Sequence, residues 1–338
     1  MKYNIINPFV VGKYLSAEYF CDREKETAFL KKQLLNGRNM TLISDRRLGK
    51  SGLINHVFEQ EDIRNHFYTI CVDLYSTGSL AELVLMFSNE VYSSLNRQHK
   101  SFRDEFFKII SSLRVGFKLD ALTGSPTFDI GLGDIQSPTM TLEQVFQFLE
   151  NADRPCLVAF DEFQQIASYE EKNVEALLRT HIQRCKNTQF IFSGSRKHMM
   201  SQMFLSPSKP FYQSTINLTL EPIPQEAYIV FALKMFHQAD KSVKAEVVGH
   251  VYDWCRGVTW YMQLMMNEMF TLTERGGCCS EDLVEVAADN VVQIQEPLYR
   301  DMLAVLPVKQ RRLLYAITRE GVARGLTSES FIQKYSLQ

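Results

Sequence analysis

A loop of eight residues constrains the fold of this chain more strongly than any other sequence feature. Residues 44–51 read SDRRLGKS, which matches the phosphate-binding pattern G-x-x-x-x-G-K-[ST] with Ser44 in place of the first glycine. In such a loop the backbone N–H groups point at phosphates, Lys50 supplies a positive charge and the Ser51 hydroxyl can ligate Mg²⁺. A chance G-K-S in a basic loop is the alternative interpretation. The pattern predicts a strand before the loop and a helix directly after it.

The first 220 residues or so predict an α/β domain with a parallel sheet, because short apolar strands alternate with helical segments. The strand candidates are residues 40–44, 67–73, 156–160 and 189–193, and the helical patterns cover 22–36, 50–60, 80–95, 142–151 and 174–185. Residues 115–138 interrupt the alternation with four glycines and two prolines. We expect this segment to be either an inserted β-hairpin or a disordered loop.

Two acids follow the apolar strand at 156–160. A carboxylate at the end of a buried strand is costly unless it meets a cation or water. Asp161 is therefore predicted to hold Mg²⁺, and Glu162 is predicted to activate the attacking water as a general base. Two surface acids that cap a strand are the alternative, but the upstream phosphate-binding loop favours the catalytic interpretation.

Polar residues also end the next strand, at 189–193. In P-loop NTPases of the additional-strand type, a polar residue at this place contacts the γ-phosphate or the attacking water, and Ser193 is the candidate here. Arg196 is predicted to stabilise charge in the transition state. The alternative is a polar strand end followed by a solvated basic turn. No N-K-x-D-like tetrapeptide of GTPase type is present, so ATP is favoured over GTP.

Strand signals end at about residue 220. After a linker at 221–224, helical patterns at 225–238, 244–255, 260–274 and 280–295 predict a helical domain, and two further helices are expected at 308–318 and 327–335. The predicted organisation is therefore a sheet domain over 1–219, a helical domain over 220–300 and a small segment over 301–338.

These motifs together resemble the archaeal-type ATPases of the STAND clade, within the AAA+-related P-loop NTPases, and are particularly similar to a group abundant in Bacteroides-like bacteria. The resemblance covers nearly the whole chain and is carried by residues 7–9, 19–26, 44–51, 161–162, 193–196, 210–212 and 257–261. It implies a P-loop NTPase parallel sheet of the additional-strand type, a helical lid domain that covers the nucleotide, and the start of a winged helix.

The resemblance also implies a site for ATP or ADP with Mg²⁺. Near the adenine it places Asn7, Pro8, Phe9 and Arg23, and in the lid it places Trp260. The nucleotide-binding loop comprises Asp45, Arg46, Arg47, Leu48, Gly49, Lys50, Ser51 and Gly52. The predicted metal ligands are Ser51 and Asp161, and the predicted catalytic residues are Glu162, Ser193 and Arg196.

Three departures from the family pattern are visible. Ser44 replaces the first glycine of the loop, and Gly257-Val258-Thr259 replaces the usual Gly-x-Pro of the lid. Gln213 follows Phe211-Tyr212, where many relatives carry Gly-Arg. This last change removes one candidate arginine finger and directs attention to Arg196.

Composition excludes several classes of protein. The chain has 37 Lys plus Arg and 39 Asp plus Glu, and a net charge of −2 argues against a protein coated in nucleic acid. No window approaches the ~18 consecutive apolar residues of a membrane span, and no signal-peptide pattern starts the chain, so we expect a cytoplasmic protein without a membrane partner. Seven cysteines without a C-x-x-C pair do not indicate a zinc site.

Three functions fit these features. The first is a slow Mg-dependent ATPase that acts as a molecular switch. The second is a nucleotide-gated interaction protein with negligible turnover, which would act through a homo-oligomer or a protein partner. The third is a DNA-associated regulator. Because residues 308–335 resemble only the first two helices of a winged helix, DNA binding is expected only if a complete winged helix exists, and Lys309, Arg311 and Arg312 are expected to form a solvated helix face.

Overall fold

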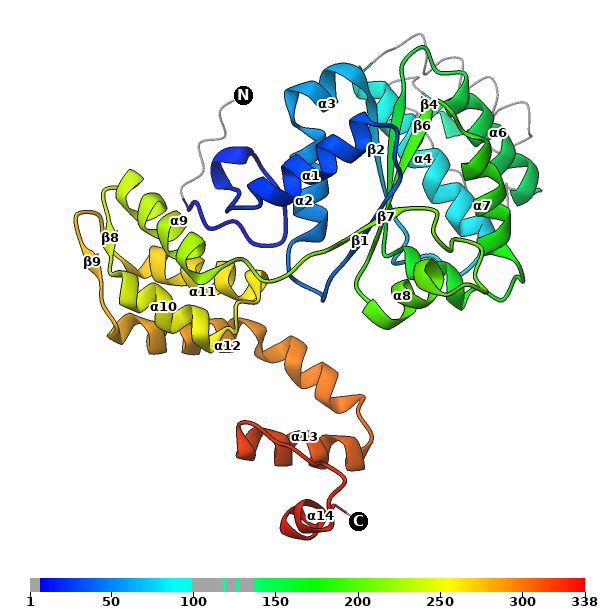
Figure 1. Cartoon of the computed structure of the whole chain (residues 1–338). Helices are drawn as coiled ribbons and strands as arrows, with labels where there is room; N and C mark the ends of the chain where they lie inside the picture. Colours follow the sequence, from blue (N-terminus) through cyan, green and yellow to red (C-terminus); the bar gives the residue numbers. More distant parts are fainter. Residues whose placement is uncertain (1–6, 99–117, 120–125, 128–136, 338) are drawn as a thin grey trace.

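A computed structural model describes residues 7–98, 118–119, 126–127 and 137–337 of the chain. The described residues form a sheet domain, a helical domain beside it, and a small C-terminal unit at the end of a long helix (Figure 1). Among these residues no helix combines the length and the apolar character that crossing a membrane requires.

The sheet has five parallel strands in the order β2-β5-β6-β1-β7. The strands are β1 (Met40–Ile43), β2 (Tyr68–Asp73), β5 (Cys156–Asp161), β6 (Thr188–Gly194) and β7 (Ile216–Thr219). Strand β6 lies between β1, which leads into the phosphate-binding loop, and β5, which ends in the predicted acids. This is the additional-strand arrangement. The first four strands match the predicted ones, whereas β7 was not predicted.

Helices cover both faces of the sheet (Figure 1). One layer contains α1 (Glu24–Leu35), α2 (Lys50–Phe58) and α3 (Glu61–His66), and the other contains α4 (Leu80–Gln98), α6 (Pro138–Glu150), α7 (Val174–Arg184) and α8 (Lys197–Leu205). Consecutive residues of β5 alternate between the two layers, because side chains of a strand point to opposite faces. Leu157 packs in the first layer and Val158 in the second. This double burial explains the continuous apolar run in the sequence.

Within the predicted insertion at 115–138, two short strands pair. Strands β3 (Lys118–Leu119) and β4 (Pro126–Thr127) are antiparallel, with Lys118 opposite Thr127. Apart from Ser137 and Pro138, the rest of that predicted segment lies outside the described residues.

The helical domain consists of α9 (Gln225–Gln238), α10 (Ala245–Trp254), α11 (Thr259–Leu272) and the first part of α12 (Asp282–Ala304). Two short parallel strands, β8 (Ser242–Val243) and β9 (Cys278–Cys279), join its loops, in a region where no strand was expected. Four methionines of α11 recur at helical spacing and are all buried in this core: Met262, Met265, Met266 and Met269. Phe9 and Cys21 belong to the same core, so residues near the start of the chain pack with the helical domain.

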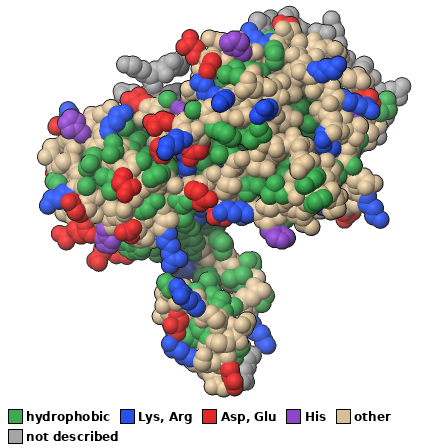
Figure 2. All heavy atoms as spheres, in the orientation of Figure 1, with side chains coloured by type: hydrophobic (Ala, Val, Ile, Leu, Met, Phe, Trp, Pro, Cys, Tyr) green, Lys and Arg blue, Asp and Glu red, His purple; other side chains and the backbone are tan. Residues whose placement is uncertain are grey.

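The C-terminal unit contains α13 (Val308–Glu320) and α14 (Glu329–Tyr335). Helix α12 passes through Pro297 and past the predicted domain boundary at residue 300. Between residues 297 and 337 only Ala316 and Phe331 are buried. Figure 2 accordingly shows hydrophobic side chains on the surface where α12 leads to this unit.

Candidate nucleotide-binding site

The phosphate-binding loop joins β1 to α2, as the sequence predicted. Helix α2 begins at Lys50, and Gly49 directly before it has a φ of 91°, a left-handed conformation that favours glycine. Ser44 has no positive φ, whereas Arg47 has a φ of 69°. The backbone at the first position of the motif therefore does not require glycine, which explains how Ser44 can stand there.

Lys50 is a buried residue, 6% exposed, and its ammonium group lies inside the loop. Its Nζ donates to the Ser44 carbonyl at 3.5 Å, the Ser44 hydroxyl at 3.3 Å and the Asp45 carbonyl at 3.3 Å. These acceptors are all uncharged, and the contacts are long. Burial lowers the pKa of Lys50, while Glu162 and Asp161 oppose that shift. A buried cation with such partners is suited to binding an anion.

Three elements meet at the Asp161 carboxylate. Its Oδ2 accepts a hydrogen bond from the Ser51 hydroxyl at 2.5 Å, and its Oδ1 accepts one from the Ser193 hydroxyl at 2.7 Å. Ser51 belongs to α2, Asp161 ends β5 and Ser193 lies in β6. The structure thus brings together three of the residues that the sequence selected separately.

The Glu162 carboxylate is held by two residues that the sequence did not single out for a role. Its Oε2 accepts from the Gln164 side-chain amide at 2.5 Å and from the Ser195 hydroxyl at 2.7 Å. Ser195 in turn accepts from Nε of Arg46 at 3.3 Å. The polar run after β6 is a sequence signal for Ser195, whereas no local signal identifies Gln164.

Asp73 is a further acid at this edge of the sheet that sequence reasoning missed. It ends β2 and is the register partner of Asp161 in the neighbouring strand. Burial raises the pKa of Asp73, and the negative charges of Asp161 and Glu162 raise it further. Its position after an apolar strand, like that of Asp161, is the signal that could have found it.

A cavity of about 860 Å³ opens beside the loop, between the sheet domain and the helical domain. This volume is within the range of small-molecule sites. The predicted residues that line it are Arg23, Arg46, Arg47, Leu48, Gly49, Lys50, Ser51, Gly52, Glu162 and Trp260. Other lining residues were not predicted. They come from the segment between Val10 and Phe20 and, in the helical domain, from Thr259 and Gln263.

Some predicted residues lie away from this cavity. Asn7, Pro8 and Phe9 do not line it: Phe9 is fully buried against the phenylalanines of the helical domain, and the Asn7 side-chain amide donates to the Asn267 carbonyl at 2.8 Å. These contacts anchor the chain directly before the cavity wall that starts at Val10. Arg196 is exposed and its Nη1 lies 3.7 Å from the Met199 sulfur, and Arg196 does not line the cavity.

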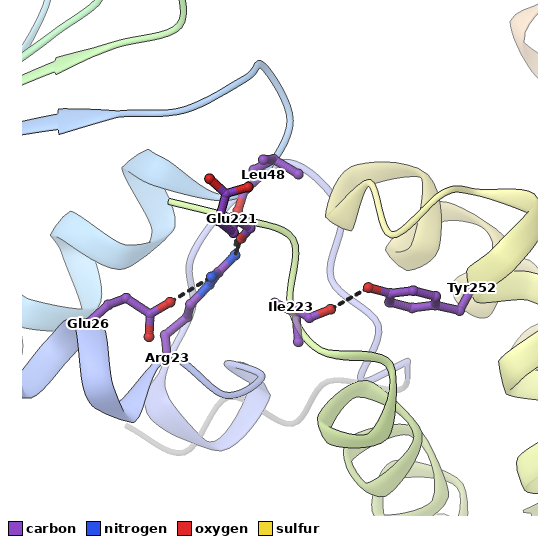
Figure 3. A network of polar contacts seen from close by, with 6 residues as sticks. All are labelled: Arg23, Glu26, Leu48, Glu221, Ile223 and Tyr252. Carbon is purple, nitrogen blue, oxygen red and sulfur yellow. Dashed lines mark hydrogen bonds and ion pairs between the residues drawn. The ribbon is translucent and has the colours of Figure 1, made fainter. Parts of the chain in front are cut away.

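Arg23 connects the phosphate-binding loop to the linker between the domains (Figure 3). Its buried guanidinium donates to the Glu221 carbonyl at 2.7 Å, to the Leu48 carbonyl at 3.4 Å and to the Glu26 carboxylate at 2.8 Å. On the other side of the linker, the Tyr252 hydroxyl donates to the Ile223 carbonyl at 2.6 Å. Arg23 is therefore a wall residue whose side chain fixes the linker.

Comparisons with known proteins agree with this architecture. The Walker-type ATPase PABY2304 of Pyrococcus abyssi is 18% identical, with 92% of this chain and 82% of that chain covered and a TM-score of 0.59. The ORC2 protein of Aeropyrum pernix, solved with ADPNP and ADP, is 16% identical, with coverages of 99% and 81% and a TM-score of 0.60. The ORC1 protein of the same organism, solved in complex with DNA, is 11% identical, with coverages of 94% and 77% and a TM-score of 0.53.

The fold is that of a P-loop NTPase. At these identities the likeness establishes the fold alone. A family model described as a probable winged helix domain matches residues 297–338, which extends the predicted C-terminal unit back into α12. The search of curated protein sequences gave no significant match.

Proposed function

We propose that the protein binds ATP with Mg²⁺ in the cavity between its two larger domains and hydrolyses it slowly, as a molecular switch of the STAND type. The observation that carries this proposal is the convergence of Lys50, Ser51, Asp161 and Ser193 at the carboxyl edge of the sheet. Lys50 and Ser51 belong to the phosphate-binding loop and line the cavity. Asp161 and Ser193 end two neighbouring strands, and Asp161 is hydrogen-bonded to both Ser51 and Ser193.

The donor set fits a magnesium ion. Mg²⁺ prefers oxygen ligands and is usually held by a few protein groups together with phosphates. The Ser51 hydroxyl and an Asp161 carboxylate oxygen are hydrogen-bonded neighbours, and these are the two groups that would hold the ion. When bound there, Mg²⁺ would neutralise phosphate charge.

The protein groups divide the remaining work. Lys50 and the loop N–H groups would bind the phosphates, and the buried ammonium would gain the anionic partner that it lacks among the described residues. Glu162 would hold the attacking water and take its proton. Ser195 and Gln164 fix the Glu162 carboxylate, so they would orient it for that step.

Turnover is expected to be slow in the isolated chain. Gln213 follows Phe211-Tyr212, where many members of the resembled family carry Gly-Arg, and Arg196 is exposed outside the cavity. A cation from a second copy or a protein partner would then complete the site. An ATPase rate per molecule that rises steeply with protein concentration supports this arrangement, whereas near-zero turnover at every concentration favours a nucleotide-gated interaction protein.

Calorimetry of ATP binding tests the proposal directly. Wild-type protein should bind ATP with micromolar affinity in the presence of Mg²⁺. The Lys50→Ala variant should lose at least tenfold in affinity, because the loop then lacks its charge. Lys172→Ala, at an exposed lysine of the sheet domain, is the control and should bind as wild type does. Absence of binding in the wild type would contradict the proposal.

A DNA-associated role is the second candidate, and the winged-helix match at 297–338 favours it. These residues include seven Lys or Arg and three Asp or Glu, a net charge of +4 in a chain of net charge −2. Arg311→Glu combined with Arg312→Glu should abolish salt-dependent binding to duplex DNA if α13 contacts phosphates. Failure of the wild type to bind DNA at low salt would exclude this role for the chain.

A further inference from the structure

The first turn of α11 in the helical domain contacts the middle of the phosphate-binding loop. The backbone N–H of Trp260 donates to the backbone carbonyl of Arg47 at 3.1 Å. The first N–H groups of a helix have no partners within the helix, and Val258 before α11 provides no side-chain cap. A carbonyl of the loop therefore caps a helix of the other domain.

The Arg47 side chain makes a second set of contacts with the same turn. Its guanidinium lies 4.3 Å from the centre of the Trp260 ring and 5.0 Å from the centre of the Tyr261 ring, and Nη1 donates to the Tyr261 hydroxyl. A guanidinium over an indole ring is a favourable cation–π arrangement. The Trp260 ring, which the family resemblance places in the lid over the nucleotide, packs against Arg47 in this structure.

These contacts depend on the backbone conformation of the loop. Arg47 has a φ of 69°, which costs free energy for any residue with a Cβ atom. In a phosphate-binding loop the N–H groups turn inward to the anion, which leaves carbonyl groups free to turn outward. A bound phosphate and the α11 contacts would consequently stabilise the same loop conformation.

We propose that Arg47 is a positioning residue that couples phosphate occupancy of the loop to docking of the helical domain. The inference rests on the proposed ATP site. Because ligand and helical domain favour one loop conformation, the coupling is positive, and it is reciprocal: the docked domain raises nucleotide affinity and the bound nucleotide tightens docking.

The two tryptophans of the chain allow a direct readout. Trp254 is 54% exposed at the end of α10, and Trp254→Phe leaves Trp260 as the single fluorescent reporter. In this background, acrylamide quenching of Trp260 should fall when ATP or a non-hydrolysable ATP analogue is added with Mg²⁺. Arg47→Met should increase acrylamide quenching of Trp260 before any nucleotide is added, because the guanidinium group no longer packs against the indole ring.

Tyr261→Phe tests the contact between the loop and α11 without changing the charge of the loop. It removes only the hydroxyl that accepts from Arg47, so the arginine charge stays in place. The variant should bind the ATP analogue roughly fivefold more weakly, the effect of one net hydrogen bond, and its Trp260 should be more accessible to acrylamide. Tyr75→Phe is the matched control, since Tyr75 lies beside Arg46 on the sheet domain.

The outcomes distinguish this inference from the proposed function. Analogue binding in the Trp254→Phe protein, with unchanged affinity in Tyr261→Phe, would overturn the coupling and leave the ATP site intact. A rise in Trp260 quenching on nucleotide addition would also overturn it, since Arg47 would then leave the helical domain for the phosphates. No binding in the Trp254→Phe protein or the wild type would overturn the ATP site and the coupling together.

Discussion

The hydroxyl oxygen of Ser51 lies 2.5 Å from Oδ2 of Asp161, although 110 positions separate the two residues. They meet because β1 and β5 are parallel and end at the same edge of the sheet, with β6 between them. Ser193 of β6 binds the other carboxylate oxygen, so two adjacent strands and the helix that follows β1 contribute to one polar cluster. The hydroxyl and the carboxylate are oxygen ligands of the kind that Mg²⁺ prefers.

The magnesium dependence of ATP binding should come from Ser51 and Asp161. Wild-type protein should bind ATP more tightly with Mg²⁺ than with EDTA, and Ser51→Ala or Asp161→Asn should bring the ratio of the two affinities close to one. Calorimetry in both conditions measures that ratio. Ser168→Ala, at an exposed serine, should keep the wild-type ratio. A full magnesium effect in Ser51→Ala would disprove the assignment.

Glu162→Gln should separate binding from hydrolysis. The amide keeps the shape of the side chain but cannot take a proton from water, so turnover should fall by about 10²-fold or more while ATP affinity changes little. Steady-state phosphate release and calorimetry measure the two quantities. Glu170→Gln, an exposed glutamate nearby in sequence, serves as the control. Hydrolysis by Glu162→Gln at the wild-type rate would show that another group is the base.

Ser44→Gly restores the full phosphate-binding motif, yet we expect no gain in affinity. The serine has no positive φ, and its hydroxyl accepts from Lys50 at 3.3 Å. Glycine would remove that contact and increase the entropy of the unfolded chain, so the free energy of unfolding should fall by roughly 0.5–1 kcal/mol. Urea denaturation and ATP calorimetry check both parts. Markedly tighter ATP binding in the variant would show that Ser44 strains the loop.

The sequence predicted best those features that depend on a short local pattern of residues. The strand at 156–160 was clear because burial on both faces demands a continuous apolar run. Strand β7 was missed because it is four residues long, lies at an edge and has alternating partial burial. The predicted end of α12 was too early, since Pro297 lies inside a helix that runs on to Ala304.

In the candidate site, too, residues with a local sequence signal could be predicted, whereas contacts between distant segments could not. Lys50 and Asp161 could be selected because each stands at a fixed place relative to its strand. The contact of Arg47 with Trp260 could not, because it joins two domains and depends on how they pack. Gln164 could not be predicted either, since its role comes from its contact with Glu162 and not from a sequence pattern.

Gly194→Ala should destabilise the protein. A Cβ atom at this buried position would lie 2.3 Å from Oε1 of Gln164 and 2.5 Å from the Met200 sulfur. The resulting shifts should cost about 1–3 kcal/mol, as in other overpacked cores. They should also disturb the Gln164 side chain that holds Glu162, so turnover should fall as well. Urea denaturation measures the stability change.

A matched glycine in the helical domain provides the control. Gly249 lies inside α10, and a Cβ atom there would be 3.6 Å from its nearest neighbour, Nε2 of Gln225. Gly249→Ala should therefore be neutral or stabilise the protein by roughly 0.5–1 kcal/mol. Equal stability of Gly194→Ala and wild type would mean that the packing around β6 is looser than the structure indicates.

ATP affinity should fall as pH rises on the alkaline side. Burial lowers the pKa of Lys50 below its usual value of 10.5, so in the free protein the ammonium form is lost at a lower pH than for a solvated lysine. Phosphate binds the charged form and raises this pKa, so binding must take up a proton wherever free Lys50 is neutral. The sign is therefore fixed: each step upward in pH near the free pKa weakens binding.

Calorimetry in buffers of different ionisation enthalpy measures this proton uptake. We expect uptake to begin at a pH below 10.5 and the affinity to decline over the same interval. Lys50→Met, which has a side chain of similar length without a charge, should bind weakly and show no such decline. A wild-type affinity that stays constant through the alkaline range, without proton uptake, would show that the Lys50 pKa is not lowered or that its charge does not contact the phosphates.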